Sequence, residues 1–525
     1  MQHLAEADVA SLLTAAEFHS RLQQAARAAL DHITVSLTEQ QQADNISLYL
    51  ERYGRHVDSF HLRGDEDCSV TFGLPGSLKP DLSSLLLHRL KLQFGHGTDQ
   101  LSAALDGAAL KYATLNGCEL QGDVVGRALR EVLSQLTGLD SLGLRSVDSR
   151  NETEHHFVLT TGALERLPLK CIVLGDMWVQ GPPKALVLQP LHYLSRLVHL
   201  ELVDLKTEGG YTLELTANML SGAGQLTTLT LKGVCETDEN EDADCDVLKV
   251  EPSVLAGKTM LQELTTAYCH IVGEVAGVGQ LLANMQHLAQ LKCIWLRNSM
   301  RAVEEGTTQA AAFAALTASS QLQLLDIGSC VLPAGVWQHT LPTGRQLSSL
   351  TRLDIAWAVQ PSGDAAPAPE GSRLVSCCPE LTSLDIRGLE YRADMPVSLK
   401  GLSELHTLRM DIPGGAAAAK SVKAVCQLNG LRELELMVPD GEELPIAVMQ
   451  LTKLELLTAL VLSQPENGVD KARLIFEVRR TMCICLVCDS VVASVWAKRL
   501  LRVQRFHRRC QPFDGLCPRG QAGLP

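Results

Sequence analysis

The hexapeptide LTSLDI, residues 381–386, decides how this chain folds, because copies of it recur along most of the 525 residues. Its pattern is L-x-x-L-x-L, with Ile, Val, Ala, Met or Phe tolerated at the apolar positions. Successive copies start 24 residues apart at the closest (Leu381 to Leu405) and 35 at the widest (Leu226 to Leu261). An internal repeat of this period predicts a stacked array rather than separate globular domains. The other clear copies start at Leu139, Leu197, Leu322, Leu350 and Leu431, and weaker ones at Val57, Leu82, Leu110, Leu169, Leu291 and Leu457.

The same hexapeptide predicts the local structure of each repeat. Its L-x-L core alternates apolar and variable positions, which is the period of a β-strand. Between the copies lie helix-compatible runs such as residues 303–320 and 416–428. Each repeat is therefore predicted to be strand, turn and helix. Because strands pack about 4.8 Å apart and helices are about 10 Å across, the parallel sheet should form the concave face and the helices the convex face.

These repeats resemble the leucine-rich-repeat family from about Val57 to Leu462. Some match the ribonuclease-inhibitor-like, cysteine-containing form L-x-x-L-x-L-x-x-C-x-L, with Cys118, Cys269 and Cys330 at the cysteine position. The resemblance implies an α/β solenoid of horseshoe shape, with these cysteines structural and pointing inward beside the loop backbone. Other repeats depart from the pattern, with Val147, Val234 and Ser299 at that position.

The two ends of the chain do not carry the repeat. We expect a helical N-terminal cap over residues 1–56, a solenoid of about fifteen units over 57–468, and a basic, cysteine-containing tail over 469–525 that forms a cap helix or is disordered. Residues 17–37, EFHSRLQQAARAALDHITVSL, resemble the second half of an F-box followed by a first repeat strand. That resemblance implies binding to a Skp-type adaptor through Phe18, Leu22 and Ala26. The Leu-Pro opening of an F-box is missing, so a plain helical cap stays open as the alternative.

Composition and motifs argue against several classes of function. A formal net charge of −14 argues against a nucleic-acid binder, whose affinity comes largely from clustered Lys and Arg. No basic region followed by an apolar run begins the chain and no apolar run is long enough to span a membrane, so we expect a cytoplasmic or nuclear protein without membrane contact. The Gly257-Lys-Thr triplet has Pro252 where a phosphate-binding loop needs Gly. Cys485 and Cys488 form a single C-x-x-C without a second pair. We therefore expect neither an enzyme nor a bound metal or cofactor.

The variable positions of the strands predict a protein-binding surface. By the period-two rule they point away from the leucines and onto the concave face. They make an acidic stripe with scattered Arg and one exposed Trp, which suits a basic or mixed-charge protein segment. In the alternative interpretation, Asp recurs only because a solvated strand edge accepts it. The predicted partner-binding residues are Glu201, Trp295, Arg297, Asp326, Arg352, Asp354, Asp385, Arg387, Arg409, Glu433 and Glu435.

Together these features predict a non-enzymatic protein-recognition scaffold. Its sharper form is the substrate receptor of an SCF-type cullin ubiquitin ligase, with the N-terminal helices on the adaptor and the repeats on the substrate. The alternative is a structural assembly subunit of a larger complex without a ubiquitin-ligase role.

Overall fold

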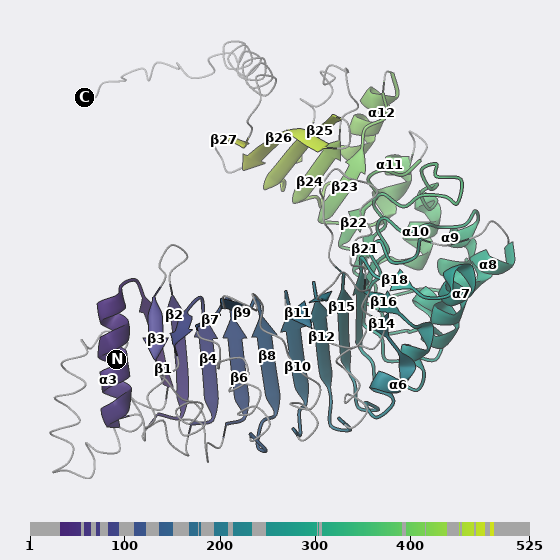
Figure 1. The fold of residues 1–525 in the computed structure, drawn as a ribbon. Coiled ribbons are helices and arrows are strands. Elements are labelled where there is room, and N and C mark those ends of the chain that lie inside the picture. The colour runs from purple at the N-terminus through teal and green to yellow at the C-terminus, as the bar shows by residue number, and fades with distance from the viewer. Residues whose placement is uncertain are drawn as a thin grey trace, which may run out of the picture. The chain divides into compact units, whose positions relative to one another are not determined.

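Figure 1 shows the computed structural model of the chain. Its residues divide into two compact units. Unit 1 comprises Met1–Pro342 with Ala358–Ala366, and unit 2 comprises Thr343–Trp357 with Pro367–Pro525. The residues described are 32–53, 57–64, 70–73, 82–93, 110–121, 136–150, 167–176, 178–179, 194–207, 214–233, 248–301, 303, 307–390, 395–414, 416–437, 451, 454–466, 469–477 and 483–487.

Unit 1 is built on a run of parallel strands, in which each strand pairs with the one from the next repeat. Each strand coincides with one L-x-x-L-x-L copy, apart from the first, which precedes them. The parallel strands are β1 (His32–Leu37), β2 (Ser59–Gly64), β4 (Ser84–His88), β6 (Tyr112–Asn116), β8 (Ser141–Arg145), β10 (Cys171–Gly175), β12 (His199–Val203), β15 (Thr228–Lys232), β17 (Glu263–Ala267), β19 (Cys293–Trp295) and β20 (Leu324–Asp326).

Short second strands follow many of these main strands and pair among themselves in parallel. They are β3 (Thr71–Gly73), β5 (Lys91–Gln93), β7 (Glu119–Gln121) and β9 (Asp148–Arg150), then β11 (Trp178–Val179) with β13 (Lys206–Thr207), then β14 (Glu214–Leu215), β16 (Lys249–Val250) and β18 (His270–Ile271). The sequence pattern did not predict them, because strands this short carry no period of their own.

Helical segments of unit 1 follow the strands. Residues 303–320, expected to be helical, hold α8 and η5, and these pack against α9 and α7. The helical segments are α3 (Gln40–Tyr53), α6 (Ala217–Leu220), η4 (Pro252–Leu255), α7 (Glu274–Met285), α8 (Thr307–Ala312), η5 (Phe313–Thr317) and α9 (Val336–Thr340). Among the helices described, none is long and apolar enough to cross a membrane.

Unit 2 repeats the plan with fewer strands, and its helices lie on one side of them (Figure 1). The parallel strands are β21 (Arg352–Asp354), β22 (Ser383–Asp385), β23 (Thr407–Asp411), β24 (Glu433–Met437) and β25 (Ala459–Glu466). The helical segments are α10 (Gly371–Cys377), α11 (Met395–Ser398), η6 (Leu399–Gly401) and α12 (Ala416–Val425), the last within the run expected to be helical.

Both ends of the repeat array differ from the sequence-based boundaries. At the start, β1 already pairs in parallel with β2, so the sheet begins before residue 57. At the end, β26 (Val469–Glu477) and β27 (Cys483–Val487) continue the sheet as antiparallel strands, where a cap helix or a disordered tail was expected. An antiparallel hairpin needs only a short connection, so it can extend a sheet after the repeat has lost its helix.

The leucines of successive repeats form the core. Leu144, Leu174 and Leu202 stand in register on neighbouring strands and are fully or almost fully buried. In unit 2 the same holds for Leu353 and Leu384. Both units therefore have the α/β leucine-rich-repeat fold that the sequence predicts.

The cysteines at the turn of the repeat are buried against the backbone of the preceding repeat. Cys118, Cys269 and Cys330 are buried, and each thiol donates a hydrogen bond to a carbonyl of the preceding repeat, with Cys330 Sγ 2.9 Å from Leu296 O. Burial raises their pKa values to about 11, 12 and 11, respectively, so the thiols stay protonated. Ser299 replaces a cysteine in the same role, with its hydroxyl 2.7 Å from Thr266 O. A continuous run of cysteines is therefore not required.

A left-handed turn follows the main strand in most described repeats. The residue seven positions after the first apolar residue of the copy has a positive φ, and in most cases its N–H donates to a carbonyl of the next repeat, as Ser146 N does to Gly175 O at 2.9 Å. This turn ends the strand and sets which side chains project at the edge of the sheet. Residues with this conformation are Arg89, Gly117, Ser146, Asp176, Asp204, Tyr268, Asn298, Ser329, Trp357 and Gly388.

Candidate functional site

The candidate site lies on the side of each sheet that carries the variable positions of L-x-L, which we call the sheet face. In unit 2 the register aligns Asp354, Asp385, Arg409 and Glu435 in one row across neighbouring strands. A second row runs through Arg352, Ser383, Thr407 and Glu433. The sequence-predicted residues of unit 2 are thus brought together by the register.

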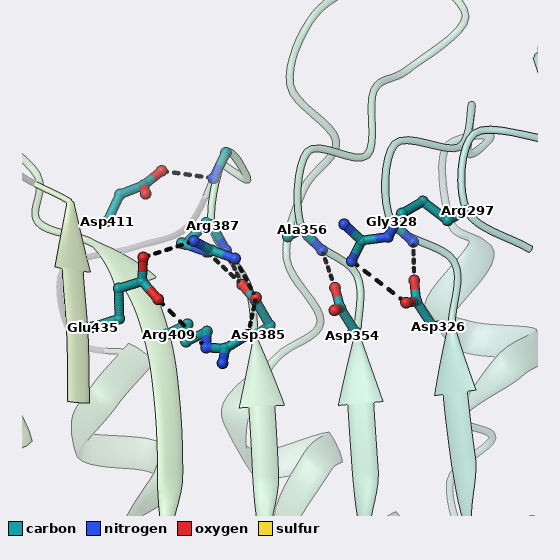
Figure 2. Close-up of polar contacts among 11 residues, drawn as sticks. Arg297, Asp326, Gly328, Asp354, Ala356, Asp385, Arg387, Arg409, Asp411 and Glu435 are labelled. Carbon is teal, nitrogen blue, oxygen red and sulfur yellow. Dashed lines mark hydrogen bonds and ion pairs between the residues drawn. The ribbon is translucent and has the colours of Figure 1, made fainter. Parts of the chain in front are cut away.

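The aspartates of the L-D-I motif are buried, which corrects the expectation of an exposed acidic stripe. Asp326 is 5% exposed, Asp354 2% and Asp385 4%. In each case Oδ1 accepts a hydrogen bond from the backbone N–H two residues later, at 3.0 Å from Gly328 N, 3.2 Å from Ala356 N and 3.3 Å from Arg387 N (Figure 2). These carboxylates therefore hold the turn after the strand, which is a known preference of Asp.

An ion-pair network, which we call the Arg387 network, organises the sheet face of unit 2. Figure 2 shows the guanidinium of Arg387 between the carboxylates of Asp385 and Glu435. Arg387 makes a fork with Asp385, at 2.7 Å from Nη2 to Oδ2 and 3.0 Å from Nε to Oδ1, and its Nη1 lies 2.9 Å from Glu435 Oε1. Arg409 pairs with Asp385 at 3.7 Å and with Glu435 at 3.4 Å. Such paired forks fix orientation as well as charge.

Asp411 borders this network and is poorly compensated. Its Oδ2 accepts the Gly388 N–H at 2.7 Å, whereas its Oδ1 is buried and has no hydrogen-bond partner among the residues described. Burial raises the pKa of Asp411 to about 6, although the Gly388 N–H and Arg387 act to lower it, and nearby Asp385 raises it further. The sequence analysis did not select Asp411, although it stands directly after its hexapeptide, at the same repeat position as the predicted Arg297 and Arg387.

Trp357, in the turn after β21, is an exposed aromatic residue that the sequence analysis did not select, whereas the predicted Trp295 is less exposed. Trp357 is 43% exposed, whereas Trp295 in β19 is half-buried. Its φ of 60° places it in the left-handed turn after β21. A tryptophan at this turn position could have been noticed in the sequence, since most other repeats have a small or polar residue there.

Unit 1 carries a more open charged cluster on its sheet face. Arg145 of β8 reaches Glu201 of β12, and His199 lies 3.7 Å from the other oxygen of that carboxylate. β10 stands between β8 and β12, and a Cβ on its Gly175 would lie 3.1 Å from Arg145 Cγ. The glycine therefore lets the arginine cross one strand. Arg297 pairs with Asp326 at 3.4 Å.

The remaining predicted residues fall into two groups. Arg352 and Glu433 are exposed on the sheet face of unit 2. Phe18, Leu22 and Ala26 lie outside the residues that the structure describes. Within the described residues, no group of three His, Cys, Asp or Glu side chains is arranged to hold a metal ion.

Comparisons with known proteins bear on the fold only. No protein-family model and no curated protein matches the chain. Among solved structures, the chain is similar to a crystal structure of an internalin from Listeria monocytogenes, with 14% identity and a TM-score of 0.46. That similarity covers 75% of this chain and 94% of the internalin chain.

Proposed function

We propose that this chain is a non-enzymatic protein-recognition scaffold that binds a partner on its sheet face. The observation that carries the proposal is the row of polar side chains in unit 2 that begins and ends with the exposed Arg352 and Glu433, beside the Arg387 network. Ion pairs hold the arginines in place, so a partner would meet a preorganised surface. Leucine-rich repeats suit this use, because surface residues vary while the buried leucines keep the frame.

Site-specific photocrosslinking tests this proposal. A benzoylphenylalanine at Arg352 would lie on the sheet face, and the same residue at Lys400, exposed on η6 beside the helices, is the control. We expect a partner from a native extract to crosslink at 352 and not at 400. A partner that crosslinks at 400 alone, or at both positions equally, would contradict the sheet face as the binding surface.

A sharper form of the proposal is the substrate receptor of an SCF-type cullin ubiquitin ligase. It is supported by the resemblance of residues 17–37 to the end of an F-box, in which a repeat strand follows the helices, the place that β1 occupies. Phe18, Leu22 and Ala26 would then contact a Skp-type adaptor. Purified adaptor should bind the full chain, and Phe18→Asp should abolish the complex.

The alternative is a structural subunit of a larger assembly without a ubiquitin-ligase role. Under this alternative the Phe18→Asp variant keeps every partner, and neither adaptor nor cullin co-purifies with the chain. Co-purification of both, lost in Phe18→Asp, would rule the alternative out.

A further inference from the structure

Trp357 is held in a conformation that does not suit its side chain. Its φ of 60° is imposed by the turn, in which Trp357 N donates to Arg387 O at 2.7 Å. A positive φ is rare for a bulky residue, and Gly or Asn adopts it at lower cost. Trp357 also remains 43% exposed. Neither the backbone nor the core therefore accounts for an indole at this position.

Gly388 contacts both Trp357 and Asp411. A Cβ at Gly388 would lie 2.3 Å from Cε3 and 2.8 Å from Cδ2 of the indole, so the ring rests against the glycine backbone. The N–H of the same glycine donates to Asp411 Oδ2 at 2.7 Å. Gly388 thus lies between an exposed aromatic ring and a half-buried carboxylate and contacts both.

The charge around this position is negative. The carboxylates of Asp354, Asp385 and Glu435 act on Arg387, and Asp411 lies beside them. The cations of the cluster are Arg387 and Arg409. Four carboxylates and two guanidinium groups leave a formal charge of −2 when Asp411 is ionised.

We propose that Trp357, Gly388 and Asp411 form one subsite, which binds a lysine or arginine side chain of the partner protein. The proposal rests on the proposed function and specifies the chemistry of its partner. A cation over the exposed part of the indole gains a cation–π contact. A positive charge within about 4–6 Å of a carboxylate also favours its ionised form. Asp411, whose Oδ1 has no donor among the described residues, would gain that charge.

The affinity should depend on pH through Asp411. The charged groups that act on it are Arg387 and Asp385, and its register neighbour on β24 is the uncharged Met437. The bound cation favours the ionised carboxylate, whose pKa in the free protein is raised to about 6. Binding should therefore strengthen as the pH rises through 6.

The test uses the full chain and a defined probe, acetyl-tetraarginine amide, with the tetracitrulline peptide as an uncharged control of similar shape. Asn at 357 tolerates the left-handed turn and removes the ring, and Asp411→Asn keeps an acceptor for Gly388 N–H. Tyr268→Asn is the matched control, because Tyr268 occupies the same turn position in unit 1 with φ 56°. Calorimetric titrations at pH 7.5 and pH 5 compare the affinities.

We expect Trp357→Asn and Asp411→Asn each to weaken arginine-peptide binding about fivefold, the order of one cation–π or ion-pair contact. A chain of net charge −14 attracts any cationic peptide, so a control is needed for this general attraction. Tyr268→Asn should bind the arginine peptide as tightly as the unchanged protein does. The affinity of the unchanged protein should fall at pH 5, and Asp411→Asn should lose that fall. Equal affinity for the arginine and citrulline peptides, or unchanged affinity in both subsite variants, would overturn the proposal.

If a variant does not fold, the pH comparison on the unchanged protein tests the subsite.

The proposed subsite and the proposed scaffold function can be contradicted separately. Crosslinking from position 352 together with unchanged peptide affinity in the variants would reject the subsite alone. Peptide binding at Trp357 without any crosslink from the sheet face would reject the proposed function instead.

Discussion

The two charged clusters on the sheet faces look alike in sequence but differ in burial. In unit 1 the side chain of Arg145 is 43% exposed where it meets Glu201, whereas in unit 2 that of Arg387 is 18% exposed between Asp385 and Glu435. The first pair stabilises less, because water already solvates the arginine, although Glu201 is only 19% exposed. The second has lost most of its water, so each member depends on the others. Similar residues on one kind of face can therefore differ in how much they stabilise the fold.

The largest loss of stability should come from placing a charge on the buried side of β22, the strand that holds Asp385 of the Arg387 network. Leu384 is fully buried beside Asp385, so Leu384→Asp buries an unpaired charge and should lower the free energy of unfolding by about 4 kcal/mol or more. Denaturant unfolding followed by circular dichroism measures it. Ser383→Asp, one residue away on the sheet face, should cost less than about 1 kcal/mol. Similar losses in both variants would contradict the inward assignment.

The second-largest loss of stability should come from removing the Arg387 side chain. Arg387→Ala leaves Asp385 and Glu435 as poorly compensated charges and should cost about 3 kcal/mol of unfolding free energy. The matched double variant Arg387→Ala with Glu435→Gln should lose less than the sum of the single changes, because the two residues share one interaction. Additive losses would show that the two side chains do not interact.

The stability of unit 2 should depend on pH through Asp411, which borders the Arg387 network. The pKa of Asp411 is raised to about 6 in the folded state, above its ordinary value of 3.8. The contribution of the protonated carboxyl to stability is therefore complete below pH 4, and about 3 kcal/mol of unfolding free energy is lost as the pH rises through 6. Asp411→Asn should remove this fall in unfolding free energy between pH 4 and pH 7. An unchanged pH profile in that variant would contradict the assignment to Asp411.

Asp354 tests the turn function of the L-D-I aspartates. Its Oδ1 accepts the Ala356 N–H, so Asp354→Ala leaves a buried donor without its acceptor and should cost about 1 kcal/mol. Asp354→Asn keeps an acceptor oxygen and should recover most of that loss. Denaturant unfolding of both variants measures the two losses. A loss in Asn as large as in Ala would indicate that charge, rather than the turn, governs this position.

The smallest effect should be in unit 1. Arg145→Ala removes a pair whose arginine is exposed and should change the unfolding free energy by about 1 kcal/mol or less, an effect that added salt diminishes further. A loss as large as that of Arg387→Ala would remove the distinction between the two clusters.

The repeat pattern was enough to predict the fold and the main strands. Copies such as LVHLEL, residues 197–202, coincide with strands such as β12, and the runs at 303–320 and 416–428 hold helices. These predictions succeeded because alternation and helical spacing are local properties of the chain. The short second strands and the antiparallel β26 and β27 lacked such a signal, because pairing with a neighbouring segment decides them.

The candidate site was predictable only as a set of positions. The sequence placed Asp385, Arg387 and Glu435 on one face, but it treated the aspartates as exposed. It also selected Trp295 and passed over Trp357. The exposure of a residue depends on the side chains that the neighbouring repeats place against it, and the sequence of one repeat does not contain this information.

By itself the sequence determined the strand spacing, the buried leucines and the face on which variable residues stand, because these follow from the period of the repeat. Only the tertiary structure decided that Arg387 meets Glu435, 48 residues away in the chain, and that Gly388 supports the ring of Trp357. Those contacts depend on the register between neighbouring repeats, and burial then fixes whether a charge stabilises the fold or remains available to a partner.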